Sequence, residues 1–379
     1  MESYSHDTGT FSGKGGVEIF FQKWIAPRSK AALVLIHGVG EHSGRYNNLL
    51  KALQGRGISV FAIDHRGHGK SHGRRGHIDS FMDYVYDLKL FIEYVKEENK
   101  GLPLILYGHS MGGVIAAKYA LTYKDDPSIV ILSSPGFNPA FTVPGWKKSV
   151  AAFFAARIGS LSMPTGLLSE DISRDSEVVK EYDNDPLVHG KVSARWFIEF
   201  MKAGEECMAN ASYLKKPLLV FHGKGDKIAD YNAAEEFYTK AGSAEKELFL
   251  YDGFYHEVIN EPEQDRNKAL KDVTAWIIKQ IEGSKKAVSS KGKGTAKKAP
   301  AKKAAPAKAA KATVKKTAPK AAAKKPAVKK GGTKTAAAKP AVKKSAPKTA
   351  AKTKTAAKKP ASAKSTAKKP AAPKKGTKK

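Results

Sequence analysis

A serine flanked by glycines leaves this chain few ways to fold. Ser110 stands in the run Gly108-His109-Ser110-Met111-Gly112. The apolar residues 103–107 before this run predict a short buried strand, and the apolar pattern of residues 111–123 after it predicts a helix. The turn between such a strand and helix is so sharp that only glycine fits beside the serine. The hydroxyl then projects above the sheet, so we expect Ser110 to be a nucleophile in a nucleophile elbow.

Continuous apolar runs recur along the chain, with helical patterns between them. Strands that are apolar throughout and alternate with helices are typical of a parallel sheet that helices cover on both faces. The predicted fold class is therefore α/β, with a mostly parallel sheet. Residues 17–24 alternate apolar and polar side chains better, which favours an antiparallel strand at the sheet edge. The predicted parallel strands are residues 32–36, 58–63, 103–107, 128–132, 217–221 and 247–251.

The fourth and fifth of these strands are too far apart for a single crossover helix. Residues from about 137 to 208 are therefore expected to form an inserted helical cap over the carboxyl ends of the strands. Within the cap, residues 146–163 place apolar side chains at helical spacing. Two interpretations stay open, a helix packed on the core and a lipid-facing helix that admits acyl chains. The apolar side chains are Val150, Phe153, Phe154, Ile158 and Leu161.

A serine hydroxyl is a poor nucleophile until a histidine takes its proton, and a carboxylate must hold the tautomer of that histidine. In sheets of this kind the chain order is Ser, then Asp or Glu, then His. Asp226 follows the fifth predicted strand and His256 follows the sixth. We therefore expect Ser110, Asp226 and His256 to form a catalytic triad. Asp230 and Asp252 are rival acids, but Asp230 lies further from its strand and suits a helix cap.

The oxyanion that forms on acyl attack needs two fixed N–H donors, each worth about 10²- to 10³-fold in rate. The backbone of Met111, next to the nucleophile, is the first expected donor. Val39 is the second, in the run His37-Gly38-Val39-Gly40 after the first parallel strand. The histidine-rich residues 64–72 could suggest a metal, but interleaved glycines and basic residues describe a tight loop better than an ordered set of ligands. We expect neither a metal nor a cofactor.

Four runs in this chain resemble those of the monoacylglycerol lipases and the related lysophospholipase-like α/β-hydrolases. They are His37–Tyr46, Asp64–Ser71, Gly108–Gly113 and Tyr182–Gly190, and the resemblance covers residues from about 16 to 283. It implies an α/β-hydrolase fold, Ser110, Asp226 and His256 as the triad, and Val39 and Met111 as the oxyanion hole. It also implies a monoacyl lipid ester, a monoacylglycerol or lysophospholipid, as substrate. Because one scaffold serves many esters, an esterase or thioesterase for a small soluble substrate is an alternative.

The composition changes abruptly near residue 284. Of the 67 basic residues, 33 are lysines in residues 285–379, a stretch with no arginine, acid or aromatic residue. The rest of the chain keeps 34 basic against 36 acidic residues, a net charge of about −2. With four valines as its only large apolar residues, the tail cannot bury a core. We therefore expect residues 284–379 to be disordered when free.

The Lys/Ala/Pro-rich tail is similar in composition to the C-terminal tails of linker histones and to lysine-rich extensions of some bacterial nucleoid proteins. Its lysines would bind a polyanion with little sequence preference and strong dependence on salt. DNA, RNA, polyphosphate and an anionic membrane surface are the candidate partners of residues 285–379. A spacer tail with no fixed partner is the alternative.

These observations predict an α/β-hydrolase domain in residues 1–283, with the cap inserted at about 137–208, and a basic tail in residues 284–379. The only cysteine, Cys207, cannot form an intramolecular disulfide, which favours a reducing compartment. The N-terminus lacks the pattern of a secretory signal, and no run of about 18 apolar residues predicts a transmembrane segment. We expect a cytoplasmic serine esterase, which its tail can hold at a nucleoid or membrane surface. A DNA-binding nucleoid or chromatin protein with an accessory hydrolase domain is the rival class.

Overall fold

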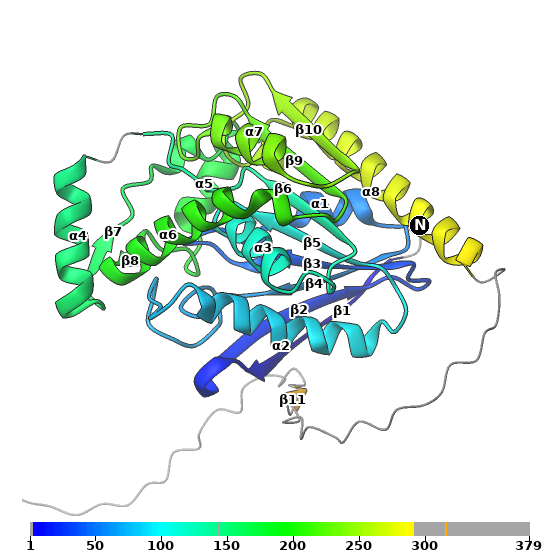
Figure 1. The fold of residues 1–379 in the computed structure, drawn as a ribbon, viewed down its shortest axis with the longest axis horizontal. Helices are drawn as coiled ribbons and strands as arrows, with labels where there is room; N and C mark the ends of the chain where they lie inside the picture. Colours follow the sequence, from blue (N-terminus) through cyan, green and yellow to red (C-terminus); the bar gives the residue numbers. More distant parts are fainter. Residues whose placement is uncertain (1–2, 142–143, 292–314, 317–379) are drawn as a thin grey trace, which may run out of the picture. The chain divides into compact units, whose positions relative to one another are not determined.

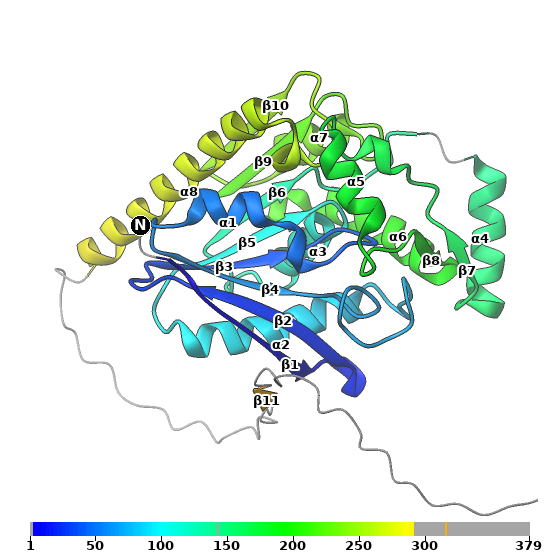
Figure 2. The ribbon, with the colours of Figure 1, turned by 180° about the vertical axis from the view of Figure 1, so that it is seen from behind.

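The computed structural model describes residues 3–141, 144–291 and 315–316. Their main feature is one twisted sheet (Figures 1 and 2). Its strands are β1 (Ser5–Ser12), β2 (Glu18–Ile25), β3 (Ala31–Ile36), β4 (Ile58–Ile63), β5 (Leu104–His109), β6 (Ile129–Ser133), β9 (Leu218–Gly223), β10 (Lys246–Tyr251) and β11 (Lys315–Lys316). Across the sheet the order is β10-β9-β6-β5-β3-β4-β2-β1-β11. The pairs from β10 to β4 are parallel, and the three pairs beyond β4 are antiparallel.

The six predicted parallel strands are confirmed, each within about two residues at its ends. Residues 17–24 form β2, which is antiparallel as predicted, but its placement at the edge is wrong because β1 pairs along its outer side. The sequence did not indicate β1, since only Gly9 and Phe11 of its eight residues are buried. A strand with so few buried side chains carries little of the apolar alternation by which strands are recognised.

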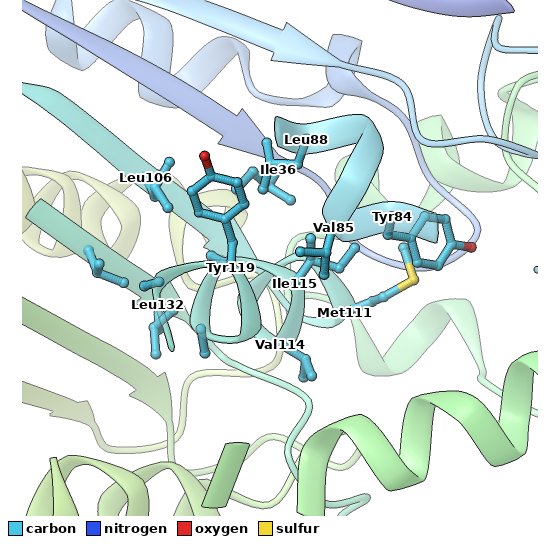
Figure 3. Close-up of a cluster of buried hydrophobic side chains, with 14 of the residues drawn as sticks. Ile36, Tyr84, Val85, Leu88, Leu106, Met111, Val114, Ile115, Tyr119 and Leu132 are labelled. Atoms are coloured by element: carbon cyan, nitrogen blue, oxygen red, sulfur yellow. The ribbon is translucent and has the colours of Figure 1, made fainter. Parts of the chain in front are cut away.

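Each strand contributes to two cores, because successive side chains point to opposite faces of a sheet. Val34 of β3 faces α2, α3, α6 and α7, whereas Leu33 faces α1 and α8. Figure 3 shows part of the first core, with Ile115 of α3 next to Val85 of α2. These helices are α1 (Asn47–Leu53), α2 (Met82–Glu98), α3 (Met111–Thr122), α6 (Ala194–Asn210), α7 (Tyr231–Lys240) and α8 (Glu263–Lys291). The predicted α/β architecture, with helices on both faces of the sheet, is confirmed.

The cap inserted between β6 and β9 lies above one end of the sheet (Figure 1). Its elements are α4 (Gly145–Ile158), β7 (Ser162–Pro164), α5 (Ser176–Asn184), β8 (Lys191–Ser193) and α6. The strands β7 and β8 form an antiparallel pair, and α6 packs on both α4 and α3. Through Trp196 and Cys207, α6 also joins the core beneath the cap.

The helix predicted over residues 146–163 is α4, which ends at Ile158. Of its large apolar side chains, Phe153 is 51% and Ile158 55% exposed, Phe154 is half-buried, and the small residues Ala151 and Ala155 are buried. The helix does pack on α6, but it does so through its small side chains rather than through most of the predicted apolar face. The lipid-facing interpretation stays open beside the packed one, because Val150, Phe153 and Ile158 are exposed.

The last described helix, α8, runs across residue 284, where the sequence analysis placed the start of the tail, and ends at Lys291. Apart from the two residues of β11, the rest of the tail lies outside the described residues, so its disorder stays a prediction. Within the described part of the chain, every helix is too short or too polar to cross a membrane.

The packing of α8 on the sheet yields the first testable prediction. Ile277 is fully buried in the core between α8 and the sheet. We expect Ile277→Ala to lower the free energy of unfolding by about 2 to 5 kcal/mol, because it leaves a cavity. Lys279→Ala, at an exposed position of the same helix, should change it by less than about 0.5 kcal/mol. Urea unfolding of both variants measures the difference, and equal effects would contradict this account of the core.

Candidate active site

Ser110 lies in the turn between β5 and α3 with a backbone φ of 54° and ψ of −118°. This region is strained for a residue with a side chain. The turn can close because of its glycines: a Cβ on Gly108 would lie 2.3 Å from the Gly112 carbonyl oxygen. A Cβ on Gly112 would lie 2.0 Å from the carbonyl oxygen of Ile36 in β3. The strand, the sharp turn and the helix around Ser110 therefore have the geometry that the sequence predicted.

Asp226 and His256 are brought together by the loops that follow β9 and β10. His256 Nδ1 donates to Asp226 Oδ2 at 2.7 Å, and both side chains are buried. Asp226 Oδ1 accepts from the backbone N–H groups of Ile228 and Ala229, at 2.8 and 3.0 Å. The carboxylate is thus fixed by its own loop before it orients the imidazole. With Nδ1 donating, Nε2 is left to accept a proton.

A second histidine, which sequence analysis missed, also contacts this carboxylate. His222 Nε2 donates to Asp226 Oδ2 at 2.8 Å and is fully buried. Its only signal in the sequence is its position, four residues before Asp226 at the end of a predicted strand. Burial alone would raise the pKa of Asp226, but His256 and His222 hold it well below its usual range.

The charge of Asp226 acts in turn on His256. Burial alone would lower the pKa of His256, but the charge and the hydrogen bond of Asp226 raise it above its usual value of 6.5. The ring centre of His109 lies 4.8 Å from that of His256, but the pKa of His109 is shifted in the opposite direction. Burial and the neighbouring His256 lower the pKa of His109 to about 4. His109 is therefore neutral near pH 7, while His256 has a basic imidazole suited to accept a proton.

The two rival carboxylates lie elsewhere. Asp230 caps α7, where its side chain accepts from the backbone N–H of Asn232 at 2.9 Å, as the sequence predicted. Asp252 is exposed and forms an ion pair with Lys224 at 2.6 Å. Of the three candidates, Asp226 is the one whose carboxylate reaches His256.

The two residues expected as oxyanion donors are both near Ser110. Met111 begins α3, and the first N–H groups of a helix lack partners within the helix. Val39 belongs to the loop after β3 and lines the same cavity as Ser110. The loop approaches the serine so closely that a Cβ on Gly38 would lie 3.2 Å from Ser110 Cβ.

The loop of residues 37–40 is held by side chains and by the cap. His37 Nδ1 donates to the carbonyl oxygen of Gly38 at 2.7 Å, and His37 Nε2 accepts from the backbone N–H of His65 at 2.9 Å. At the other end of the loop, the Gly40 carbonyl oxygen accepts from the backbone N–H of His189 in the cap, at 2.8 Å. The loop that carries Val39 is therefore held by hydrogen bonds at both of its ends.

The histidine-rich residues 64–72 form a tight loop that supports the loop of residues 37–40. Burial holds the pKa values of His65 and His68 well below the usual range, so both imidazoles are neutral. Asp64 ties the loop together by accepting from the backbone N–H groups of Ser43 and Lys70, at 2.9 and 2.8 Å. Among the described residues, no group of three or more His, Cys, Asp and Glu side chains is placed to hold a metal ion.

Two adjoining cavities meet at Ser110. They share Ser110 with Val39, Thr165, Leu167 and Ile228. The first, of about 320 Å³, is lined mainly by polar side chains, and we call it the polar arm. The second is lined by apolar side chains of the cap, and we call it the apolar arm. The polar arm includes Glu41, Asp183, Asp185, His256 and Glu257, and the apolar arm includes Phe141, Trp196, Phe197, Phe200 and Met201.

These parts together define a class of protein. A mostly parallel sheet whose central strand ends in a strained serine elbow, and whose later strands are followed by an acid and a histidine, is the α/β-hydrolase fold. The model of the Hydrolase_4 family, described as serine aminopeptidase, S33, matches residues 27–263. The monoacylglycerol lipase of Mycolicibacterium smegmatis is 35% identical over 286 residues, which cover 74% of this chain and 100% of that relative. The chain belongs to the Hydrolase_4 family.

Two solved structures have the same fold. The crystal structure of the Paleococcus ferrophilus monoacylglycerol lipase matches with a TM-score of 0.63 and 31% identity, covering 69% of this chain and 99% of that one. A soluble variant of the Saccharomyces cerevisiae monoglyceride lipase, in complex with a substrate analog, matches with a TM-score of 0.66 and 27% identity, covering 73% and 96%. The predicted resemblance to monoacylglycerol lipases is confirmed, and it places this chain among the carboxylic ester hydrolases of its family.

The raised pKa of His256 yields a pH prediction. A base must be neutral to accept a proton, so ester hydrolysis should be lost as the pH falls through that pKa, with a midpoint above 6.5. Asp226→Asn removes the charge that raises the pKa, so the midpoint should move to lower pH and kcat should fall by about 10⁴-fold. Asp230→Asn is the matched control and should keep the midpoint of the wild type. A pH profile of Asp226→Asn with an unchanged midpoint would show that another group titrates.

Proposed function

We propose that this chain hydrolyses the carboxylic ester of a monoacylglycerol through an acyl-serine intermediate. The observation that carries this proposal is the pair of cavity arms with Ser110 at their junction. A monoacylglycerol has an apolar acyl chain and a polar glycerol on opposite sides of its ester. The lining of the apolar arm, a space of about 100 Å³, suits the part of the acyl chain next to the ester, and the lining of the polar arm suits the glycerol. The ester carbon would then lie beside the serine hydroxyl.

The charges of the polar arm favour a neutral headgroup over a phosphate. Carboxylates of Glu41, Asp183, Asp185 and Glu257 line it. The guanidinium of Arg45 is engaged by Glu41 and Glu257. The phosphate of a lysophospholipid would be placed against carboxylates, and like charges disfavour binding. Among the two lipid classes that the sequence left open, we therefore favour the monoacylglycerol.

The proposed reaction uses five groups. Ser110 Oγ attacks the ester carbon while His256 Nε2 takes the hydroxyl proton, and Asp226 stabilises the imidazolium that forms. The backbone N–H groups of Val39 and Met111 donate to the negative oxygen of the tetrahedral intermediate. The bond to the glycerol oxygen then breaks, and His256 gives its proton to that oxygen. In the second half of the reaction, His256 takes a proton from water, and the resulting hydroxide attacks the carbonyl carbon of the acyl-serine. The bond to Ser110 Oγ then breaks, His256 returns its proton to that oxygen, and the fatty acid is released.

The outer surface of the cap also suits a lipid substrate. Phe153 and Ile158 of α4 are about half exposed, and Trp146 at its start is 66% exposed. The helix packs on α6, whose aromatic residues line the apolar arm. Exposed apolar side chains on a helix favour contact with a lipid surface. An acyl chain could then pass from lipid to the apolar arm with little exposure to water.

The tail supports a second function, that of binding a polyanion. Its 33 lysines, with no acidic residue to offset them, adjoin a nearly neutral catalytic part. Neutralising phosphates with lysines releases counterions, which drives binding to any nucleic acid or anionic surface. We infer that the tail holds the esterase on such a partner. A nucleoid protein with an accessory hydrolase domain is less favoured, because Ser110, Val39 and His256 line one cavity and Asp226 binds His256.

The proposed substrate and nucleophile are tested with Ser110→Ala. We expect fatty acid release from monoacylglycerols by the full-length wild type to fall by a factor of about 10⁴ or more in this variant, since the nucleophile is lost. Release from lysophospholipids of matched acyl chain should be slow in both proteins. Labelling by a fluorophosphonate, which reacts with an activated serine, should occur in the wild type alone.

Three outcomes would contradict parts of this proposal. Equal turnover by Ser110→Ala would show that Ser110 is not the nucleophile. Faster release from lysophospholipids than from monoacylglycerols would overturn the choice of headgroup. Wild type that is labelled by fluorophosphonate but releases no fatty acid would have an active serine and another substrate.

The role of the tail is tested with a chain that ends at Lys291, where α8 ends. This shortened chain should hydrolyse esters at a rate within about twofold of the full chain, because the site lies entirely before residue 291. It should lose binding to duplex DNA at about 150 mM salt, whereas the full chain binds and weakens steeply as salt rises. Fluorescence anisotropy with labelled DNA measures the DNA binding of both chains and its dependence on salt. Equal DNA binding by the two chains would contradict the proposed role of the tail.

A further inference from the structure

A buried carboxylate beside the site takes no part in the reaction proposed above. Glu41 is 4% exposed and lies in the wall of the polar arm. Its Oε1 accepts from the backbone N–H of Gly38 at 2.6 Å and from the Tyr46 hydroxyl at 2.7 Å. Its Oε2 accepts from Arg45 Nη1 at 3.1 Å. A carboxylate has about four acceptor positions, so the protein itself fills most of them and leaves little for a headgroup.

The bond to Gly38 places Glu41 at the oxyanion loop. Gly38 precedes Val39, the proposed donor, and packs against Ser110 so closely that a Cβ there would lie 3.2 Å from Ser110 Cβ. The side chain of Glu41 therefore reaches back three residues and fixes the peptide that precedes the donor. A displacement of that peptide would move the adjoining Gly38–Val39 peptide, which carries the proposed donor N–H, relative to Ser110.

The other oxygen of Glu41 connects this loop to the segment that carries His256. Arg45 binds Glu257 with two hydrogen bonds, at 2.6 and 3.0 Å, while it also binds Glu41. The ring of Tyr182 from the cap lies over the Arg45 guanidinium at 4.6 Å. Glu257 directly follows His256 in the chain. The backbone N–H of Glu257 donates to the carbonyl oxygen of Ile172, in the cap, at 2.7 Å. A continuous array of buried charges thus runs from the oxyanion loop to the base.

This array also keeps Glu41 in the form that binds the loop. Burial alone would raise the pKa of Glu41, but Arg45 and the nearby His109 and His37 lower it to about 2. Burial alone would lower the pKa of Arg45. Glu257 and Glu41 outweigh this effect and raise the pKa of Arg45 above its usual value. Glu41 is therefore ionised across the working pH range, and a charged acceptor binds an N–H more strongly than a neutral one.

We propose that Glu41 is a positioning residue for the oxyanion hole. It holds the peptide of Gly38 so that the Val39 N–H points at the reacting carbonyl, and Arg45 with Glu257 ties this loop to the segment of His256. Glu41 acts through Val39 and does not bind the headgroup, although it lies in the polar arm. This role rests on the functions proposed above for Ser110 and Val39.

The test compares two substrates, a monoacylglycerol and a 4-nitrophenyl ester that has no glycerol. The variants are Glu41→Ala, which removes the acceptor, and Glu41→Gln, which keeps one oxygen for Gly38 but loses the charge. Loss of one oxyanion donor costs about 10²- to 10³-fold in kcat, so a loosened donor should cost about 10- to 100-fold. We expect this fall in kcat for Glu41→Ala with both substrates alike, KM within about threefold of the wild type, and a smaller fall for Glu41→Gln.

Two controls separate this role from a purely structural one. Counting active sites with a fluorophosphonate gives kcat per folded site, which misfolding alone would leave unchanged. Glu181→Ala, at an exposed position of α5 outside both arms, is the matched carboxylate control and should behave as the wild type. If Glu41→Ala does not fold, kcat per site of Glu41→Gln decides, and it should fall by the same factor with both substrates.

A loss confined to the monoacylglycerol, or expressed in KM, would overturn the proposal and make Glu41 a headgroup ligand. Unchanged kcat per active site in both variants would overturn it as well. A different result bears on the proposed function instead. Wild type that cleaves the 4-nitrophenyl ester but no monoacylglycerol would defeat the proposed substrate, while the comparison of Glu41 variants on the 4-nitrophenyl ester would still decide the role of Glu41.

Discussion

The strained backbone of Ser110 is the constraint on which the site depends. A serine adopts a φ of 54° only where its surroundings leave no alternative, at a cost of about 1 to 3 kcal/mol. The surroundings here are β5 and α3, both almost wholly buried, with two helices on one face of the sheet and four on the other contributing to its cores. The large apolar cores of the sheet stabilise a conformation that the elbow alone would not hold. The hydroxyl can then be directed at the cavity without support from a flexible loop.

The buried charged side chains of this site have hydrogen-bond or ion-pair partners. Asp226 receives four hydrogen bonds, two from backbone N–H groups and two from histidines, and Arg45 lies between two carboxylates. An unmatched charge at these depths would cost several kcal/mol, so each group depends on its partners. The same matching sets the chemistry, because the ionised Asp226 makes His256 more basic and the ionised Glu41 accepts from the oxyanion loop.

Most of the sheet and the elbow could be predicted from the sequence, because central parallel strands are apolar throughout and a Gly-x-Ser-x-Gly run between a strand and a helix has few structural uses. The Ser, Asp and His residues were found from their order after strands. β1 was missed because an outer strand buries few side chains. The direction of α4 was not predictable either, since its alanines and its aromatic residues both recur at helical spacing and only the surface of α6 selects between them. His222 binds Asp226 across only four residues, but no periodic pattern marks such a contact. The pairing of Arg45 with Glu257, 212 residues away, depends on a tertiary contact that no local pattern encodes.

The cap does more than cover the cavity, because its segment around residues 182–190 braces the oxyanion loop. His189 donates its backbone N–H to Gly40, and His42 Nε2 and Asp185 Oδ2 lie 2.8 Å apart. Gly40 has a positive φ, and a Cβ there would lie 2.5 Å from the His189 carbonyl oxygen, so the cap fits against bare backbone. A movement of this segment would therefore reach the oxyanion loop directly. The structure thereby couples the part of the chain that surrounds the substrate to the part that would stabilise its transition state.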